Sequence, residues 1–238
     1  MTYNVHRCVG RGGVDSIAEI ASLCAEAQAD IIAMQELDAP ETDEEEGVHH
    51  ARALASELSM TLLFCRTFRR GVGYYGHALL SRTPLELKRV TTFPSERHPD
   101  AEPRGAIWAR TLLGGKTLDI ISTHLGVTRR ERQAQSQALI GEEWLDSPEL
   151  RRPVILCGDL NAVPRASTYR RLASRLRDAQ RLAGGRPKAT FPSVLPILRL
   201  DHVFVSPDVG VRGVTVPWNR RSRRASDHLP LIVDLELP

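Results

Sequence analysis

The strongest constraint on the fold is a pattern that recurs along the whole chain: short, apolar, strand-like runs interrupted or ended by a carboxylate, amide or imidazole. In "VILCGDLN" the run Val154–Cys157 is followed by an acid and an amide two residues apart. A single case would be an ordinary turn or cap. Six strand ends with complementary chemistry indicate a shared site instead, because buried polar groups are costly without partners. The residues concerned are Asn4, Glu36, His124, Asp159, Asn161, Asp201, Asp227 and His228.

Apolar periodicity predicts more strands than helices. Helices are expected over residues 14–30, 48–58 and 130–145 and from about Ser167, with a capping box formed by Ser16 and Glu19. Residues 66–76 are expected to form a basic, glycine-rich loop. This mixture favours an α/β (α+β) fold with a two-sheet core and helices outside, rather than a doubly wound parallel sheet. Strands are expected at 2–6, 30–37, 61–65, 77–81, 85–92, 105–113, 117–123, 154–157, 200–205, 211–216 and 231–237, with Gly114-Gly115 as a hairpin turn.

Composition bounds the class of protein. The chain has 238 residues, 42% of them hydrophobic and 26% charged, which is an ordinary globular balance. It has no internal linker or repeat, so one domain over residues 1–238 is expected. No apolar run reaches the roughly 18–20 residues of a membrane span, and no signal-peptide pattern is present. The cysteines show no C-x-x-C spacing, so they are expected to be free thiols of a cytoplasmic protein. The first strand opens almost at Met1, which leaves open a natural start upstream.

The residue types at the strand ends are typical of an oxygen-liganded metal site. Glu36, Asp227 and the side-chain oxygen of Asn4 form a sparse all-oxygen set, which suits Mg²⁺ or Mn²⁺. Zinc is not indicated, because no HExxH motif or cysteine cluster is present. The pair His49-His50 is expected in a polar loop without partners.

The chain also supplies groups that recognise or protonate a phosphate. His124 and His228 can donate to a phosphoryl oxygen or move a proton near neutral pH. The formal net charge is +3, and nearly all basic residues are arginines. Arginine favours bidentate contacts with phosphate, although genomic base composition can enrich arginine as well.

The motifs "TYNVH", "MQEL", "STHL", "GDLNA", "LDHVFVS" and "SDHLPL" occur in this order from residue 2 to residue 237. The set resembles the ordered motifs of the endonuclease/exonuclease/phosphatase superfamily, which includes deoxyribonucleases, exonuclease III-like enzymes, sphingomyelinases and inositol polyphosphate 5-phosphatases. The resemblance implies a four-layered αββα sandwich of two mixed β-sheets, with the site at one end of the sheets. It also implies a metal-dependent phosphoesterase. Glu36 would be the main ligand of Mg²⁺ or Mn²⁺, with Asn4 beside it and Asp227 near the metal; one metal and two metals both stay open.

The same resemblance implies catalytic roles for the remaining strand-end residues. His228 would be the general base or a phosphate ligand, oriented by Asp201. Asp159 and Asn161 would flank the scissile phosphate, and Asp159 is a competing candidate for the base. His124 would donate to a phosphoryl oxygen or to the leaving group. The reaction would be in-line attack of water on a phosphodiester.

The substrate is not determined by the motifs. The "TYNVH" segment looks more like sphingomyelinase-type and other bacterial members than like apurinic endonucleases, which favours a lipid or small-molecule phosphodiester. A DNA or RNA nuclease is the alternative, supported by the arginines of "NRRSRR" at 219–224 but not by the 5% aromatic content. A binding module without activity is disfavoured, because every matched catalytic position is filled. Arg104, His77 and His6 are expected to line the substrate pocket, and a monomer is expected.

Overall fold

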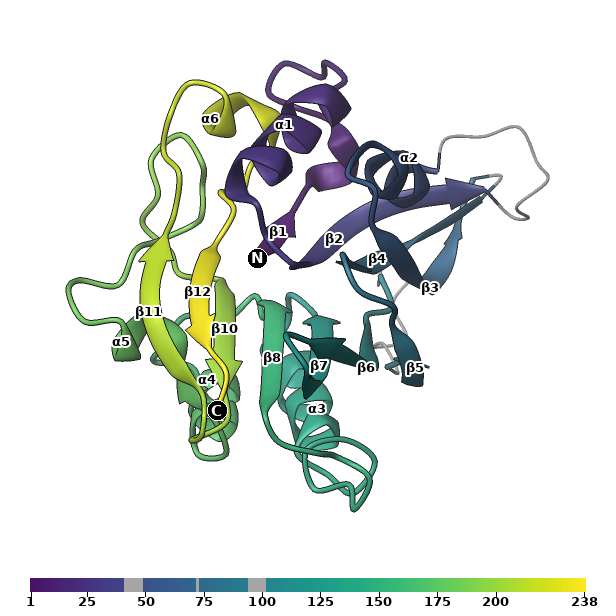
Figure 1. Cartoon of the computed structure of the whole chain (residues 1–238). Coiled ribbons are helices and arrows are strands. Elements are labelled where there is room, and N and C mark those ends of the chain that lie inside the picture. The colour runs from purple at the N-terminus through teal and green to yellow at the C-terminus, as the bar shows by residue number, and fades with distance from the viewer. Residues whose placement is uncertain (41–48, 72, 94–101) are drawn as a thin grey trace.

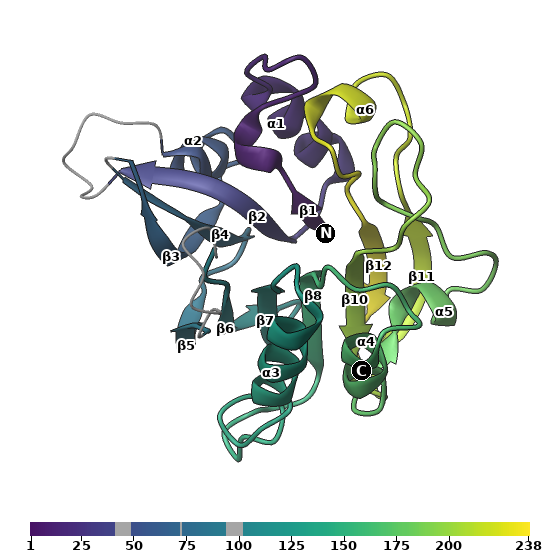
Figure 2. The ribbon, with the colours of Figure 1, turned by 180° about the vertical axis from the view of Figure 1, so that it is seen from behind.

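Two mixed β-sheets lie face to face, with helices on their outer sides (Figures 1 and 2). This computed structural model describes residues 1–40, 49–71, 73–93 and 102–238. The first sheet has the strand order β1-β2-β4-β3, and the second has the order β5-β6-β7-β8-β10-β9. In each sheet one neighbouring pair is parallel, β1 with β2 and β7 with β8, and the other pairs are antiparallel.

The strands of the two large sheets have the following bounds: β1 Thr2–Asn4, β2 Ile31–Pro40, β3 Thr61–Arg70, β4 Gly73–Ser81, β5 Glu86–Thr92, β6 Gly105–Leu113, β7 Lys116–His124, β8 Val154–Asp159, β9 Arg177–Asp178 and β10 Asp201–Val205. A separate pair consists of β11 Gly210–Thr215 and β12 Ile232–Glu236. The helices are η1 His6–Cys8, α1 Ile17–Ala27, α2 His50–Glu57, α3 Arg129–Leu139, α4 Ser167–Ala173, α5 Ala179–Leu182 and α6 Ser222–Ala225.

Three apolar clusters separate four layers. One cluster lies between α1, α2 and the first sheet, one lies between the two sheets, and one lies between the second sheet and α3 and α4. Strand alternation produces this division, because successive side chains point to opposite faces. In β8, Ile155 and Cys157 join the cluster between the sheets, whereas Leu156 joins the cluster under the helices. The expected αββα sandwich is therefore confirmed.

Several local expectations were wrong. The Ser16–Glu19 capping box does not form, because the Ser16 hydroxyl donates to the carbonyl oxygen of Ala225 instead, and the Asp15 carboxylate accepts from the Ile17 amide. The third expected helix, residues 130–145, ends at Leu139, where the chain turns into Gly141. Val48, the expected start of α2, lies outside the described residues.

The expected basic loop at residues 66–76 is mostly sheet. β3 continues to Arg70 and β4 starts at Gly73, and Phe68 faces Tyr75 across the pair with ring centroids 5.0 Å apart. The aromatic residues favour the extended strands over a loop, because cross-strand aromatic pairs stabilise a hairpin. Among the described residues, none of the helices combines the length and apolar character needed to cross a bilayer.

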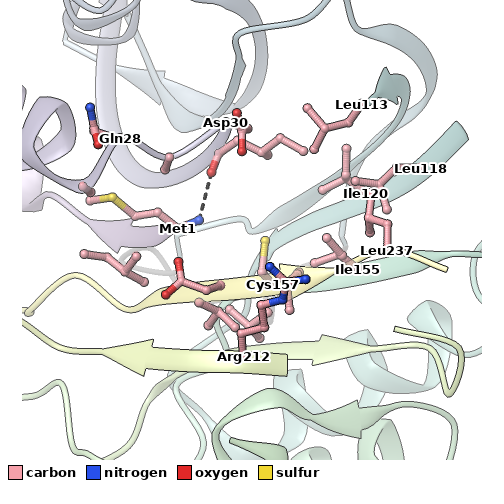
Figure 3. A pocket seen from close by; sticks show the side chains of 18 residues that line it. Met1, Gln28, Asp30, Leu113, Leu118, Ile120, Ile155, Cys157, Arg212 and Leu237 are labelled. Atoms are coloured by element: carbon pink, nitrogen blue, oxygen red, sulfur yellow. Dashed lines mark hydrogen bonds between the residues drawn. The ribbon is translucent and has the colours of Figure 1, made fainter. Parts of the chain in front are cut away.

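A cavity of about 490 Å³, lined by apolar and charged side chains, lies between the sheets at the end where β1 begins (Figure 3). Its walls are the turn between α1 and β2 on one side and β12 on the other. β12 pairs with β11 along one edge. Next to its other edge, the isolated bridge between Thr2 and Leu231 joins β1 to the segment before β12. The Met1 amino nitrogen donates to the Ile31 carbonyl oxygen at 2.9 Å in this wall, and burial lowers its pKa.

Fusing a five-residue strand ahead of Met1 is expected to raise the free energy of unfolding by about 2 kcal/mol. If the antiparallel register of Thr2 with Leu231 continues, the first, third and fifth residues counted back from Met1 lie opposite Val233, Leu235 and Leu237. Apolar residues there would fill the cavity, and an amide would replace the buried amino group. The control is the same composition with the apolar residues at the second and fourth positions. Equal denaturant midpoints for the two fusions would contradict the prediction.

Candidate active site

The two large sheets bring the polar strand ends together at one end of the sandwich. Asp159 ends β8, where it lies opposite His124 of β7 on one side and Asp201 of β10 on the other. Asn4 ends β1 in the first sheet and reaches across to Asp159. Because β1 and β8 end at the same edge of the sandwich, residues separated by 155 positions in the sequence share one hydrogen bond. The strand ends at Asn4, His124, Asp159 and Asp201 therefore meet at one place in the fold.

Asp159 is the centre of this cluster. Its Oδ2 accepts from Asn4 Nδ2 at 3.1 Å and lies 3.6 Å from His124 Nε2 and 3.7 Å from His228 Nε2. Its Oδ1 accepts from the Asn161 amide at 2.8 Å. Burial raises the pKa of Asp159, although the neighbouring charge on His228 works against that shift. A buried carboxyl group between two imidazoles is suited to exchanging protons near neutral pH.

His228 and Asp201 form a buried ion pair. His228 Nδ1 lies 2.8 Å from Asp201 Oδ2, and the Phe191 ring packs against the imidazole with centroids 4.8 Å apart. Burial disfavours the charged imidazole, but the carboxylates of Asp201 and Asp159 outweigh that effect and raise the pKa of His228 to about 10. The pairing fixes the ring orientation and leaves Nε2 facing Asp159. His228 and Asp201 are therefore in direct contact, and their catalytic roles stay a prediction.

Glu36 is presented by a β-bulge. The register of β2 against β4 shifts between Gln35 and Leu37, and Glu36 has a φ of 62°. A non-glycine residue in this region is strained by about 1–3 kcal/mol, and such strain is typical of functional sites. Glu36 Oε1 accepts from Asn4 Nδ2 at 2.9 Å. The bulge therefore places this carboxylate beside the Asp159 cluster.

The donor set fits a hard divalent cation. Asn4 Nδ2 donates to both Glu36 and Asp159, so two carboxylates converge on one amide, while Asn4 Oδ1 accepts from the His6 amide at 3.1 Å. Ligand atoms of Asp159, Asp201 and His228 lie within 4.8 Å of one another. Asp201 Oδ1 is buried and has no hydrogen-bond partner among the described residues. Carboxylate oxygens with unused lone pairs are what Mg²⁺ and Mn²⁺ prefer.

Asp227 is tied to the site through Ser226. The Ser226 hydroxyl donates to the Asn4 carbonyl oxygen at 2.8 Å and lies 3.3 Å from Asp227 Oδ1. The Asp227 side chain is exposed, and it lines a cavity of about 370 Å³ together with His6. The His6 ring bonds the Val9 carbonyl oxygen at 3.1 Å. Neither Glu36 nor Asp159 lines this cavity. Among the described residues, hydrogen bonds link the Asp227 side chain to the cluster only through Ser226 and Asn4.

Arg104 and His77 lie close to His124, the imidazole of β7 that faces Asp159. Arg104 is buried, its Nη2 pairs with Glu102 at 2.9 Å, and its Nε and Nη1 have no partner among the described residues. Burial lowers the pKa of His77 to about 3, and the charge of Arg104 adds to this effect. Burial and the Arg104 charge also hold the pKa of His124 well below its ordinary value. Asn161 Nδ2 lies 3.3 Å from His124 Nε2 and donates to the Leu125 carbonyl oxygen.

Two findings were not predicted from the sequence. Tyr75 is buried, and burial raises its pKa. It lies close enough to Glu36 and Arg104 for their charges to affect that pKa as well. The sequence feature that indicates a buried Tyr75 is its place in an aromatic run with strand-like alternation, within the segment that is predicted to be a loop. His49 and His50 also have partners, contrary to expectation: His49 accepts from the Arg52 amide, and buried His50 accepts from the Asp38 amide.

Gly158→Ala is expected to destabilise the fold by about 4 kcal/mol or more. A Cβ at Gly158 would lie 1.8 Å from the Thr123 carbonyl oxygen of the paired strand, and the φ of 142° strains any other residue. Gly210→Ala, in strand β11, is the control, because the nearest atom to its Cβ is a side-chain carbon at 3.2 Å. Denaturant unfolding measures both variants. Similar stabilities would show that β7 and β8 can separate at this point.

Comparisons with known proteins place the chain in a family. Residues 1–228 match the sequence profile of the Endonuclease/Exonuclease/phosphatase family. The uncharacterized protein YbhP of Escherichia coli K12 is 30% identical over 191 residues, which cover 79% of this chain and 73% of YbhP. An endonuclease/exonuclease/phosphatase structure from Bacteroides vulgatus aligns over 100% of this chain and 97% of its own, with 20% identity and a TM-score of 0.79. The mannosyl-6-phosphatase Bt3783 of Bacteroides thetaiotaomicron aligns over 99% and 98%, with 19% identity and a TM-score of 0.78. The chain therefore belongs to the endonuclease/exonuclease/phosphatase family, whose members are hydrolytic phosphoesterases.

Proposed function

We propose that this chain is a divalent-metal-dependent phosphodiesterase that hydrolyses a lipid or small-molecule phosphodiester by in-line attack of water. The observation that carries the proposal is the convergence on Asp159 of two imidazoles, His124 and His228, with Asn4 linking Asp159 to Glu36. Carboxylates for a metal, donors for phosphoryl oxygens and a buried proton acceptor are the groups that such a reaction needs.

The chain's own residues would bind and orient the phosphate. A Mg²⁺ or Mn²⁺ ion held by Glu36, with Asn4 and Asp227 beside it, would supply neutralisation of the charge that develops on the phosphoryl and leaving oxygens. His124 and Asn161 would donate to a phosphoryl oxygen or to the leaving group. Asp201 would keep the His228 ring in one tautomer and orientation, since it pairs with Nδ1.

Two residues compete for the water proton. His228 would accept it at Nε2, a role that requires the neutral imidazole; positive charge near the ring would favour that form. In the alternative, His228 stays charged and donates to the phosphate, and Asp159, whose pKa is raised by burial, accepts the proton. The substitution of His228 described in the Discussion separates these assignments.

Arg104 would contact the substrate phosphate, with His77 and His6 beside it. The support is the burial of Arg104, whose Nε and Nη1 have no hydrogen-bond partner among the described residues, next to two imidazoles whose pKa values are lowered. We further propose a monomeric cytoplasmic enzyme, which agrees with four buried, free cysteines. Light scattering during size-exclusion chromatography measures the mass.

Parallel hydrolysis assays test the proposed function. Bis-p-nitrophenyl phosphate, sphingomyelin, plasmid DNA and an abasic-site duplex would each be incubated with Mg²⁺, Mn²⁺ or EDTA. EDTA-sensitive cleavage of the small diester or the lipid is the expected result. Cleavage of DNA at low enzyme concentration would favour the nuclease alternative, in which the exposed arginines follow the nucleic-acid backbone. No metal-dependent cleavage of any of these substrates would contradict the phosphodiesterase proposal.

A further inference from the structure

Exposed, large apolar side chains are concentrated on one surface. Five of the ten such side chains among the described residues lie within residues 194–218. Leu195, Ile197 and Trp218 expose 65%, 69% and 55% of their surface, and Val194 and Leu198 complete the group. We call these five residues the apolar tip. A contiguous apolar patch on a folded protein marks a binding surface.

The fold holds the apolar tip open. Phe191 and Leu198 form a β-bridge, with the Leu198 amide donating to the Phe191 carbonyl oxygen at 2.8 Å. Leu195 donates to the Pro192 carbonyl oxygen inside this closed loop. Trp218 Nε1 donates to the Ser193 carbonyl oxygen at 3.1 Å, which joins the loop to the segment before α6. These hydrogen bonds pair backbone groups within the loop and fix its conformation. The apolar side chains at the end of the loop are exposed to solvent in that conformation.

Cationic side chains surround the apolar tip. Arg186 and Lys188 line a cavity of about 720 Å³ together with Ile197 and Trp218, and the Arg223 guanidinium lies 5.4 Å from the Trp218 ring centroid. Residues 183–200 and 209–226 contain no aspartate or glutamate. Asp227 borders this surface, since it lines a cavity with Val194 and Arg223. Apolar side chains framed mainly by cations are typical of surfaces that bind anionic membranes.

The same loop is bonded to the candidate active site. The Ser193 amide donates to the Asp227 carbonyl oxygen at 2.6 Å, and its hydroxyl donates to the Ser226 carbonyl oxygen at 2.7 Å. The Phe191 ring packs on the His228 ring. In both ribbon views the segment that follows α5 runs along the same side of the molecule as α6 (Figures 1 and 2). A surface held by the apolar tip would therefore lie beside His228.

We propose that the apolar tip, together with Arg186, Lys188 and Arg223, docks the protein on an anionic lipid bilayer and presents membrane phosphodiesters to the active site. This inference rests on the proposed phosphodiesterase function and names its substrate class as a membrane lipid. A nucleic acid could use the cations and stack a base on Trp218, but it would gain little from the four aliphatic side chains of the apolar tip.

Vesicle sedimentation in EDTA tests the docking without turnover. The wild-type protein is expected to bind phosphatidylcholine vesicles that contain phosphatidylglycerol more tightly than pure phosphatidylcholine vesicles. Leu195→Ser with Ile197→Ser should lower the partition coefficient about tenfold or more, since two apolar side chains no longer enter the bilayer. Arg186→Gln and Lys188→Gln should each lower it about fivefold, on anionic vesicles only.

Leu112→Ser is the matched control, because Leu112 is 59% exposed and lies at the end of β6, next to the Gly114-Gly115 turn. Thermal melts establish that each variant is folded. No vesicle binding by the wild-type protein, or equal binding by the double variant and Leu112→Ser, would overturn the proposal. The protein could instead bind DNA and no vesicles. If Arg186→Gln and Lys188→Gln weaken that DNA binding and the double variant does not, the cations serve a nucleic acid. Binding is measured in EDTA, so the result does not depend on hydrolysis. If the protein hydrolyses no diester, that outcome counts against the proposed function and not against membrane docking.

Discussion

His228→Ala is expected to lower kcat for a phosphodiester by about 10³-fold or more, with the fold intact. His228 is buried, bonds Asp201 at 2.8 Å and faces Asp159 through Nε2 at 3.7 Å, so its removal deletes a group that donates to or accepts from the reacting atoms. Steady-state kinetics on bis-p-nitrophenyl phosphate, with saturating Mn²⁺, measures the loss. The control is His49→Ala. His49 caps α2 and packs on Phe64, so this substitution removes a structural histidine and controls for the loss of an imidazole as such.

The pH profile of the same variant decides the role of His228. If His228 accepts the water proton, the variant should lose the limb of the kcat profile that reports this group. If the limb persists and the loss in kcat is mild, Asp159 becomes the better candidate for the base. Asp201→Asn should reproduce much of the His228→Ala loss, because an amide in that position disturbs the tautomer and orientation of the ring.

Glu36→Gln is expected to abolish metal-dependent hydrolysis, with a loss of about 10³-fold or more. The substitution keeps the size of the side chain and an oxygen that can accept from Asn4 Nδ2, but it removes the negative charge that a divalent cation needs. Activity would be measured across a Mn²⁺ titration. Near-native rates at any Mn²⁺ concentration would remove Glu36 as the main ligand.

Thermal stability provides a second measurement that does not depend on turnover. A ligand that binds only the folded state raises the Tm with its concentration. Mn²⁺ should therefore raise the Tm of the wild-type protein and leave that of Glu36→Gln nearly unchanged. Glu57→Gln is the matched control, because Glu57 is exposed at the end of α2. A Mn²⁺ response of Glu36→Gln equal to that of Glu57→Gln would place the metal elsewhere.

Local patterns predicted most of the elements. The hairpin of β6 and β7 with its Gly114-Gly115 turn, and the strands β8 and β10, follow from alternation and turn chemistry, which act over a few residues. Errors occurred where a distant partner changed the outcome. Ser16 is a good capping residue, but its hydroxyl bonds Ala225, which is 209 positions away. Tyr75 falls in the segment 66–76, where glycines and basic residues predict a loop, but β3 continues to Arg70 and pairs with it.

The sequence by itself determined that polar side chains end the apolar strands and that their chemistry suits a phosphoester. Neighbouring residues set the strand and turn preferences, so this information is local. Only the tertiary structure decided that Asn4 bonds both Glu36 and Asp159, that Glu36 adopts a positive φ at a bulge, and that the loop after Phe191 packs on His228. These contacts depend on how two sheets are stacked and which strand ends meet, and no short segment of the chain encodes that stacking. Buried carboxylates and imidazoles gain their partners and their shifted pKa values only when the sheets close over them.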